Sequence, residues 1–565
     1  MSAAEPTPPT LDESERRHLF PRLSDDDVAR LAAVGRERRL SDGEILWEEG
    51  AQDVPFFVVL EGAVAILVGS PERTVVVHEP GGFTGDIDLL SGRVAAVRAR
   101  AVGATRLAEI DRKVLQALVR TEVDLADVLL GAFTARRAAL IAGGFASVVI
   151  VGSPQAPGTL QLQEFLTRNA RPYVYLDLER DPPARALLEH AFVEPADLPV
   201  VVSRGKVVKR PTIEGVAACL GLDRLGSSAV RDLVVVGAGP AGLAAAVYGA
   251  SEGLDVLVLE AYAPGGQAGA SSRIENYLGF PTGISGNDLA ARAFVQAEKF
   301  GATLAMARTA ARLDCDAHPY RVQVNGETVR TRAIIVATGA EYRRVGCSEL
   351  ARFEGLGVYH AATALEMRMC EREDVVVVGG GNSAGQAAMS CARAARHVHM
   401  LVRGPGLADS MSEYLIRRIR EAPNVELRTR TEITAVEGGD HLERLTWEDR
   451  RDGGRTSASI RHVFLMTGAT PNTRWLEGCV LLDSHGFVCT GGDLMRSDLD
   501  AARWPLERLP HLFETSLPGV FAVGDVRAGS IKRVAAAVGE GSACVQFVHK
   551  LLAEPWARSP GAAAT

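Results

Sequence analysis

Two glycine-rich loops are the parts of this sequence with the clearest capacity for chemistry. The first occupies residues 237–242 and the second residues 379–384, and each follows an apolar run. In such a loop the first glycine makes a tight turn, the second lets the backbone approach a pyrophosphate, and the third small residue lets helix and strand pack closely. Each loop predicts a dinucleotide site, the alternative being an empty βα turn. The residues concerned are Gly237, Gly239, Gly242, Gly379, Gly381, Asn382, Ser383 and Ala384.

The residues that end the next strands differ in charge. Glu260 lies 18 positions after Gly242, at the end of the predicted strand 255–259, where an acid accepts the hydroxyls of a ribose. Arg403 ends the corresponding run 397–402 after the second loop. A cation there suits the 2′-phosphate of NADP better than NAD, and a surface arginine is the alternative. Two dinucleotide sites in one chain predict hydride transfer between nicotinamide and flavin.

The elements that position these residues are alternating strands and helices from residue 231 to about residue 552. Further apolar strands at 333–337 and 464–466 end in Thr-Gly, and a strand at 520–523 ends in Gly-Asp. This region resembles thioredoxin reductase and its low-molecular-weight flavoprotein relatives. The resemblance is carried by the two glycine loops, by these strand ends, and by Pro264-Gly-Gly-Gln267, Ile274-Glu-Asn276-Tyr277 and Arg533-Val-Ala535.

The resemblance implies a Rossmann-like flavoprotein with two dinucleotide-binding domains, FAD and NADPH as cofactors, and a homodimer. The FAD-binding domain would comprise residues 231–345 and 469–552, with the NAD(P)H-binding domain, 346–468, inserted between them. The implied FAD contacts are Glu260, Gly266, Gln267, Asn276, Thr338, Gly339, Gly524, Asp525, Arg533, Val534 and Ala535.

One departure from that family changes the expected reaction. Thioredoxin reductase carries Cys-Ala-Thr-Cys shortly before its second glycine loop, whereas this chain has Ala361 and Ala364 in place of the two cysteines. Passing electrons from flavin to a protein disulfide needs a dithiol, and Cys370 nearby is single. His360 would lie near the flavin, as a proton donor or as a structural residue. No catalytic residue is assigned.

We therefore expect hydride to pass from NADPH to FAD and on to an unidentified acceptor: a redox protein such as ferredoxin or flavodoxin, a quinone or oxygen. A thiol-disulfide reductase with a non-standard cysteine, and a signalling protein that senses redox state or nucleotides without turnover, are the alternatives. The eight cysteines form no Cys-x-x-Cys and no zinc-like spacing with histidine, so we expect reduced, mostly buried thiols and no metal site.

Residues 12–142 form a separate module of short strands followed by a helix. The segment around Gly85-Asp86 and Arg93-Val94-Ala95 resembles the phosphate cassette of cyclic-nucleotide-binding domains, which implies an all-β barrel. Asp86 would accept from the ribose and Arg93 would neutralise the cyclic phosphate. Val94, and residues 141–142 further on, depart from that pattern by lacking hydroxyl groups, so regulation by a cyclic nucleotide stays open. No helix-turn-helix follows, which argues against a transcription factor.

Residues 146–222 resemble a thioredoxin-like α/β domain. The resemblance rests on Leu198-Pro199, with Pro199 expected to be cis, followed by a hairpin and a final helix. The redox cysteines should follow the first strand, but residues 152–157 contain none, so the domain is expected to be redox-dead and to serve docking or the relay of conformational change.

The bulk composition restricts the partners. A net charge of -8 argues against nucleic acid, and the sequence shows neither a signal peptide nor an apolar run long enough for a membrane span. We expect a cytoplasmic protein.

Overall fold

The structure is a computed structural model that divides into two units. It describes residues 19–68, 72–85, 89, 95, 97–142, 148–154, 156–178, 180–181, 184, 188, 193–203, 206–226, 230–271, 274, 277–342, 347–353, 356–359, 362, 367, 370–439, 441–467 and 469–554. One unit holds residues 1–226 and 295–307, and the other holds 227–294 and 308–565. The domain boundaries given above remain predictions.

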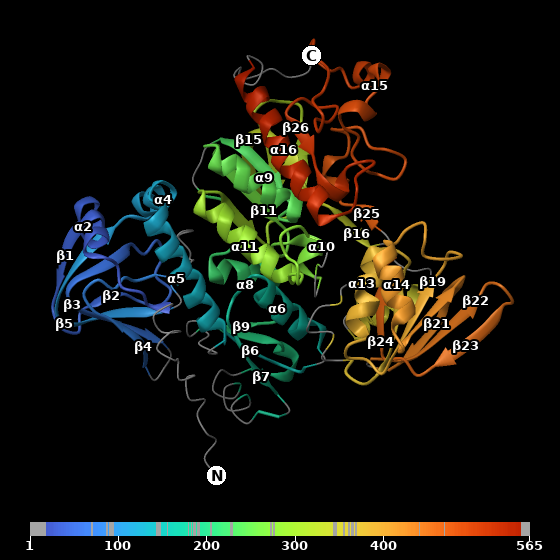
Figure 1. Ribbon diagram of the computed structural model, residues 1–565, viewed down its shortest axis with the longest axis horizontal. Helices are drawn as coiled ribbons and strands as arrows, with labels where there is room; N and C mark the ends of the chain where they lie inside the picture. The colour runs from blue at the N-terminus through green and yellow to red at the C-terminus, as the bar shows by residue number, and fades with distance from the viewer. Residues whose placement is uncertain are drawn as a thin grey trace. The chain divides into compact units, whose positions relative to one another are not determined.

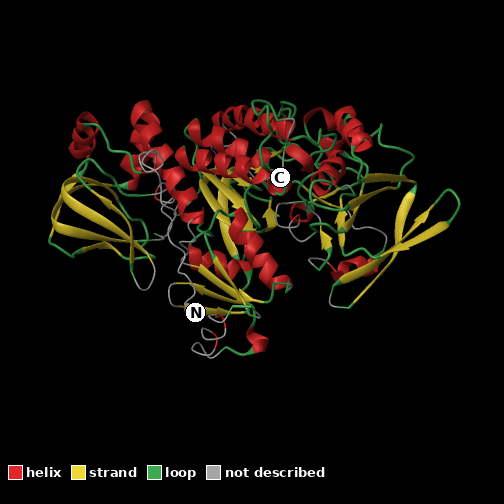
Figure 2. Cartoon of the chain, turned by 60° about the horizontal axis from the view of Figure 1, so that its bottom comes forward, coloured by secondary structure: helices red, strands yellow, loops and turns green. Residues whose placement is uncertain are grey.

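The N-terminal part of the first unit is an antiparallel sheet with helices (Figure 1). The strands are ordered β1-β5-β3-β4, with β2 on β5. They are β1 (Arg36–Leu40), β2 (Ile45–Trp47), β3 (Phe56–Val68), β4 (Arg73–His78) and β5 (Arg98–Ile110). Helix α2 (Asp25–Val34) precedes them, and α4 (Arg112–Thr121) and α5 (Val123–Ala142) follow. In Figure 2 these strands form the yellow group at the left.

The alternation of side chains along β3 explains why both faces of this sheet are covered. Phe56 and Val58 pack in one cluster with Phe133 of α5, whereas Phe57 and Val59 pack in another on the opposite face. Successive strand residues point to opposite faces, so a strand with apolar residues at consecutive positions builds two cores.

A second part of the first unit is a four-stranded sheet in the order β7-β6-β8-β9. Its elements are β6 (Val148–Gly152), α6 (Pro157–Arg168), β7 (Val174–Asp177), β8 (Val200–Ser203), β9 (Lys206–Lys209) and α8 (Ile213–Leu220). The peptide bond before Pro199 is cis, which confirms that expectation.

The second unit contains two parallel sheets, each carrying one glycine loop. In the first sheet, β11 (Val256–Glu260), β10 (Arg231–Val236) and β15 (Glu327–Val336) are parallel neighbours in that order. Strand β26 (Val520–Ala522) pairs in parallel with β15. Two antiparallel strands, β14 (Tyr320–Val324) and β13 (Ala310–Asp314), extend the sheet from β15. Its helices are α9 (Pro240–Ser251), α10 (Gly266–Gly269) and α16 (Val534–Ala553). Helix α11 (Gly286–Lys299) begins in the second unit and ends in the first, and strand β12 (Thr303–Met306) belongs to the first unit.

The second parallel sheet has the order β17-β24-β18-β19-β20. Its elements are β17 (Val358–Tyr359), β18 (Asp374–Val378), α13 (Asn382–Cys391), β19 (His397–Val402), α14 (Glu413–Glu421), β20 (Val425–Thr429) and β24 (His462–Leu465). An antiparallel sheet follows, made of β21 (Thr431–Gly438), β22 (Leu442–Asp449) and β23 (Gly454–Ala458). One face of the parallel sheet packs on α13 and α14, and the other packs on Trp447 and its neighbours in β21 and β22.

Two short strands pair antiparallel between the two parallel sheets in the sequence: β16 (Ala340–Tyr342), which follows β15, and β25 (Ala469–Pro471), which follows β24. The remaining short elements are the 3-10 helices η1 (Pro195–Asp197), η2 (Ser348–Phe353), η3 (Arg474–Leu476), η4 (Gly491–Asp493) and η5 (Gly524–Val526), and the α-helix α15 (Arg496–Ala501). In the described part of the chain, no helix combines the length and apolar character that a bilayer crossing requires.

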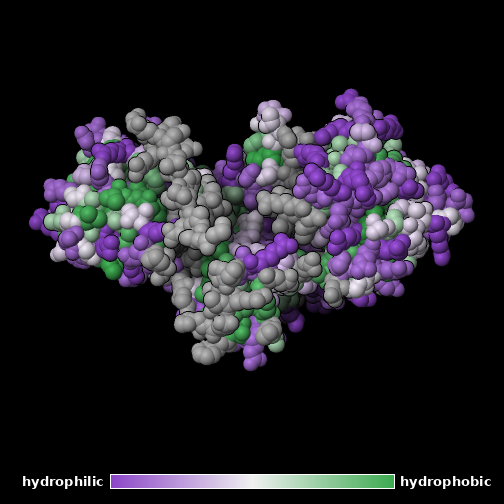
Figure 3. Space-filling view, turned by 90° about the horizontal axis from the view of Figure 1, so that it is seen from below, coloured by the Kyte–Doolittle hydropathy of each residue, from purple (hydrophilic) through white to green (hydrophobic). Residues whose placement is uncertain are grey.

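The right-hand lobe in Figure 3, which carries β21–β23, shows mainly hydrophilic residues.

Candidate dinucleotide-binding sites and the cysteines

The first glycine loop joins β10 to α9, and its three glycines have different neighbours. Gly237 has a φ of +106°, and a Cβ there would lie 2.3 Å from Ala337 O. A Cβ on Gly242 would lie 1.9 Å from Gly237 O. At Gly239, by contrast, the nearest heavy atom would be Gly266 Cα at 4.0 Å. The protein itself requires glycine at the first and third positions, and the second position faces open space that a pyrophosphate can fill.

The acid predicted to accept ribose hydroxyls lies beside this loop. Glu260 ends β11, and its carboxylate accepts hydrogen bonds from Ala238 N at 2.7 Å and Tyr262 N at 2.9 Å. These backbone donors fix the carboxylate next to the glycine turn. A carboxylate has about four acceptor positions, so it keeps capacity for hydroxyl donors of a ligand.

The remaining residues predicted around this loop come from three further segments. Gly266 begins α10, and a Cβ on it would lie 3.1 Å from Gly239 Cα. Gln267 donates from its amide to Ala340 O. Thr338 Oγ1 donates to Asn472 O at 2.9 Å, and Asn472 Nδ2 donates to Thr338 O at 3.1 Å. These two hydrogen bonds hold the segment before β16 against the segment after β25. Gly339 follows in the left-handed region with a φ of +63°. Asn276 lies outside the described residues.

Tight helix packing brings the C-terminal predicted residues to the same loop. A Cβ on Gly541 of α16 would lie 2.1 Å from Ala241 O of α9, and one on Gly524 would lie 3.0 Å from Ala241 Cβ. Asp525 follows in η5, and burial raises the pKa of its carboxyl; Lys532 opposes this shift and Glu540 adds to it. Arg533 is the N-cap of α16, so Arg533, Val534 and Ala535 present the helix N-terminus, which favours negative charge.

An ion pair that the sequence does not predict supports η5. Glu540 accepts from Gly524 N at 2.7 Å and from Arg527 Nη2 at 2.7 Å. Both carboxylate oxygens are therefore engaged, and the turn that carries Asp525 is held on α16. No spacing in the sequence signals this pair, because α16 is a helix whose facing residue depends on how it packs.

The second loop repeats the geometry of the first. Gly379 has a φ of +139°, and a Cβ there would lie 2.1 Å from Met466 O, whereas at Gly381 the nearest atom would be Ser410 O at 3.8 Å. Asn382 Oδ1 accepts from Ser412 N at 2.8 Å. At the start of α13, Ser383 is exposed and Ala384 is buried. The second glycine again faces open space at a helix N-terminus.

Arg403 lies directly after β19, at the carboxyl edge of the parallel sheet, where nucleotides bind in such folds. Its side chain is 82% exposed, and its nearest acid is Glu432, with 3.9 Å between Arg403 Nε and Glu432 Oε1. Glu432 also pairs with Arg450, a second cation at this edge that the sequence did not single out. Arg403 is thus accessible and only weakly engaged.

The cyclic-nucleotide-type segment is described in part. Gly85 has a φ of +103° and its carbonyl accepts from Arg136 Nη1 at 2.8 Å. Arg136 is buried over the Phe83 ring, at 4.5 Å from the ring centroid, and was not predicted. Ala95 N donates to Ala51 O at 2.9 Å. Asp86, Arg93 and Val94 lie outside the described residues, and the side chains of residues 141–142 are not described.

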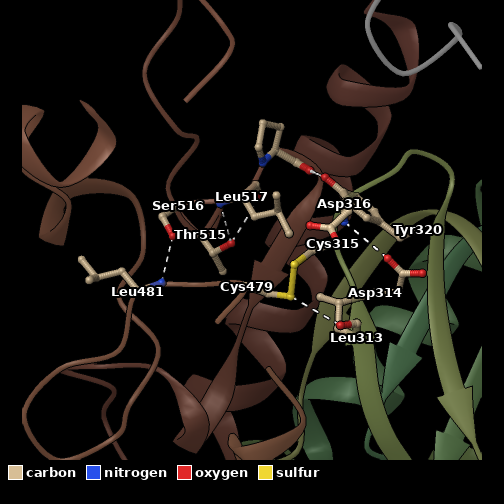
Figure 4. Close-up of a disulfide and its surroundings, with 11 residues drawn as sticks. Leu313, Asp314, Cys315, Asp316, Tyr320, Cys479, Leu481, Thr515, Ser516 and Leu517 are labelled. Carbon is tan, nitrogen blue, oxygen red and sulfur yellow. Dashed lines mark hydrogen bonds between the residues drawn. A yellow bond between two sulfur atoms is a disulfide. The ribbon is translucent and has the colours of Figure 1, made fainter. Parts of the chain in front are cut away.

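The expectation of eight reduced thiols is wrong for two of them. Cys315 and Cys479 form a disulfide with 5.9 Å between their Cα atoms (Figure 4). They are 164 positions apart. Cys315 follows β13, Cys479 follows η3, and Cys479 Sγ lies 3.4 Å from Leu313 O. The fold brings together two half-buried cysteines that no short motif connects.

The other six cysteines are thiols. Cys219 is exposed, and Cys347, Cys370, Cys391, Cys489 and Cys544 are buried. Burial raises the pKa of Cys347, Cys489 and Cys544. A thiol with a raised pKa stays protonated at neutral pH and is a poor nucleophile. The expectation of reduced, buried thiols therefore agrees with these three. The predicted flavin-side positions 360, 361 and 364 lie outside the described residues.

Two strand–glycine–helix loops on two parallel sheets define a protein with two dinucleotide-binding folds in one chain. The chain belongs to the pyridine nucleotide-disulphide oxidoreductase family, whose model matches residues 231–541. A cyclic nucleotide-binding domain model matches residues 37–122.

Individual relatives agree with this assignment. The chain is 32% identical over 328 residues to the thioredoxin reductase of Mycolicibacterium smegmatis, covering 58% of this chain and 98% of that protein. It is 33% identical over 328 residues to NADPH-dependent thioredoxin reductase 3 of Arabidopsis thaliana, covering 56% of this chain and only 57% of that protein's length. The crystal structure of T. acidophilum thioredoxin reductase matches with a TM-score of 0.51 and 25% identity, covering 57% of this chain and 99% of that one.

Proposed function

We propose that this chain is an FAD-dependent NADPH oxidoreductase that does not use the dithiol of thioredoxin reductases. The observation that carries the proposal is the open space at Gly239 and at Gly381. Each is the second glycine of its loop, and at each a Cβ would meet no protein atom closer than 3.8 Å. Close approach of a pyrophosphate gives a reason for glycine there that the protein's own packing does not.

FAD, when bound, would accept a hydride from NADPH and pass the electrons on. The residues of the chain supply the binding. Glu260 would accept the ribose hydroxyls of FAD, and the N-termini of α9 and α16 would face its negatively charged part. Asp525, with its raised pKa, would provide a polar contact that is more readily neutral than an ordinary carboxylate. The N-terminus of α13 and Arg403 would bind the phosphates of NADPH.

The test of this proposal is anaerobic reduction. Purified protein should be yellow, and NADPH should bleach the flavin absorbance faster than NADH does. A colourless protein that cannot be reconstituted with FAD would refute the proposal.

The acceptor is proposed to be a redox protein, a quinone or oxygen, because Ala361 and Ala364 replace the cysteines that would reduce a protein disulfide. NADPH oxidation should be slow with thioredoxin and rapid with ferricyanide or a quinone. A Cys370→Ser variant should behave like the wild type, since Cys370 is fully buried and belongs to no Cys-x-x-Cys motif. Rapid thioredoxin turnover that is lost in Cys370→Ser would reveal a cysteine route through this residue.

A thiol-disulfide reductase is the second candidate, and the Cys315–Cys479 disulfide favours it over a protein without turnover. Two electrons and two protons would convert this disulfide into two thiols, which would then reduce a disulfide in a substrate and return to the oxidised pair. Thioredoxin-dependent turnover that disappears in Cys315→Ser, with Cys219→Ser as the matched control, would support this candidate over the first.

We further propose that residues 37–122 bind a cyclic nucleotide that regulates the reductase. Arg93 would contact the cyclic phosphate and Asp86 the ribose. Calorimetry with cyclic AMP and cyclic GMP tests the binding. Heat of binding that is lost in Arg93→Ala is expected, whereas no heat with either nucleotide would contradict regulation through this segment.

A further inference from the structure

Three metal-ligating side chains meet on one face of the second parallel sheet. His397 and His399 alternate along β19 and therefore point to the same face. Strand β20 runs parallel to β19 with His399 opposite Glu426, which places the carboxylate on that face too. One ligand atom from each of the three side chains lies within 4.8 Å of the other two.

The distances at Glu426 match those between ligand atoms around a shared cation, and one of them is also a hydrogen bond with His399. Glu426 Oε2 lies 3.1 Å from His399 Nδ1 and 3.5 Å from His397 Nε2. The second distance lies beyond the common range of 2.7–3.2 Å for an N–H···O hydrogen bond. Around a tetrahedral zinc ion with ligands at 2.0–2.1 Å, neighbouring donor atoms are about 3.3–3.4 Å apart. The two observed distances lie on either side of that value.

The surroundings fix the three ligands and leave access for an ion. Arg428 Nη2 lies 2.8 Å from both oxygens of Glu426, including the Oε2 that faces the histidines, and this bidentate contact fixes the orientation of the carboxylate. The Trp447 ring packs against His399 with 5.2 Å between centroids, and Trp447 is 2% exposed. Such outer contacts hold ligating groups in place in metal sites. The ligand side chains remain partly exposed, at 32% for His397, 14% for His399 and 43% for Glu426.

Asp374, the acid next to His397 in the sheet, does not provide a fourth metal ligand. Asp374 pairs in register with His397, but both its oxygens accept from Arg396 at 2.8 Å. Three protein ligands would therefore leave a fourth position for water. Two imidazoles with one carboxylate select a zinc-class ion over magnesium or calcium, which prefer oxygen ligands alone.

We propose that His397, His399 and Glu426 bind one divalent transition-metal ion of the zinc class. The site lies at the amino ends of β19 and β20, whereas Gly381 and Arg403 lie at the carboxyl edge of the same sheet. Six strand positions, about 20 Å, separate His397 from Arg403, and four positions, about 13 Å, separate His399 from it. The ion would join β19 to β20 and stabilise this sheet without contacting the nucleotide.

The experiment uses the full-length protein, stripped with a chelator and titrated with Zn²⁺ in competition with a chromophoric chelator. One ion per chain should bind, and His397→Gln and His399→Gln should each weaken binding at least tenfold. Exposed His485→Gln is the matched control and should bind as the wild type does. The flavin spectrum and the rate of its reduction by NADPH should be the same in all four proteins, which separates this site from the proposed reductase function.

A second measurement does not depend on the variants folding. Cu²⁺ added to the stripped wild-type protein should give an electron paramagnetic resonance spectrum with nitrogen couplings from two imidazoles. The proposal is overturned if Zn²⁺ binds only at millimolar concentration, if Cu²⁺ shows no nitrogen ligands, or if Zn²⁺ binding survives in the His397→Gln/His399→Gln double variant.

Discussion

Replacing single glycines of the first loop should separate the needs of the protein from those of the cofactor. At Gly239 an added methyl group would have its nearest protein neighbour at 4.0 Å, so the free energy of unfolding of the cofactor-free protein should change by less than about 0.5 kcal/mol. At Gly242 the same methyl group would lie 1.9 Å from Gly237 O, which forces the backbone to move. Overpacking of this kind costs about 1–3 kcal/mol.

The two variants should therefore fail in different ways. Gly239→Ala should keep its melting temperature without FAD but lose most of its FAD, because the methyl group occupies the space that the pyrophosphate needs. A loss of about 2–3 kcal/mol in binding corresponds to a roughly 30- to 150-fold weaker Kd. Gly242→Ala should melt at a lower temperature whether or not FAD is present.

The assay combines the flavin-to-protein absorbance ratio with thermal melts in the presence and absence of added FAD. At 100 times Kd, FAD should stabilise the wild type by about 2.7 kcal/mol, and this increment should be largely absent in Gly239→Ala. Gly492→Ala is the control, because Gly492 is exposed and a Cβ there would meet nothing within 4 Å. FAD binding by Gly239→Ala equal to that of the wild type would refute the placement of the pyrophosphate at this loop.

Three other outcomes follow from the same reasoning. Gly381→Ala should raise the KM for NADPH with little change in melting temperature, whereas Gly379→Ala should lower the melting temperature, since its Cβ would lie 2.1 Å from Met466 O; equal melting of the two would contradict the distinction. Arg403→Ala should reduce the preference for NADPH over NADH about tenfold, or ~1.4 kcal/mol, through loss of one charge-assisted contact, measured as the ratio of anaerobic flavin reduction rates. Reducing the Cys315–Cys479 disulfide, or replacing Cys315 by serine, should lower the free energy of unfolding in urea by about 2–5 kcal/mol, because the bond closes a loop of 164 residues; an unchanged midpoint would argue against the bond.

The residues of the site that could be predicted from sequence are those whose type is determined by the local backbone conformation. A tight turn after a buried strand requires glycine at Gly237 and Gly379, and both have positive φ angles in the structure. Glu260 and Arg403 could be placed because a residue at the end of the next strand of a parallel pair lies beside the loop.

The parts that could not be predicted depend on contacts between distant segments. The Cys315–Cys479 pair requires the antiparallel strands β13 and β14 to lie next to the segment after η3. No sequence motif near either cysteine indicates that these two segments are in contact. Similarly, the alternation of His397 and His399 is visible in the sequence, but the partner Glu426 depends on the register of β20 after a helical crossover.

The two glycine loops have the same backbone arrangement. We propose that the charges of Glu260 and Arg403 make one loop specific for FAD and the other for NADPH. Both second glycines are N-caps with extended backbone, at φ -70° for Gly239 and φ -92° for Gly381. Backbone alone therefore makes both loops suitable for a pyrophosphate, and Glu260 and Arg403 would distinguish the two nucleotides. The electron acceptor, by contrast, depends on side chains that replace the missing dithiol. Varying the acceptor therefore separates the proposed functions more sharply than varying the nucleotide, because every candidate with turnover shares the same hydride donor.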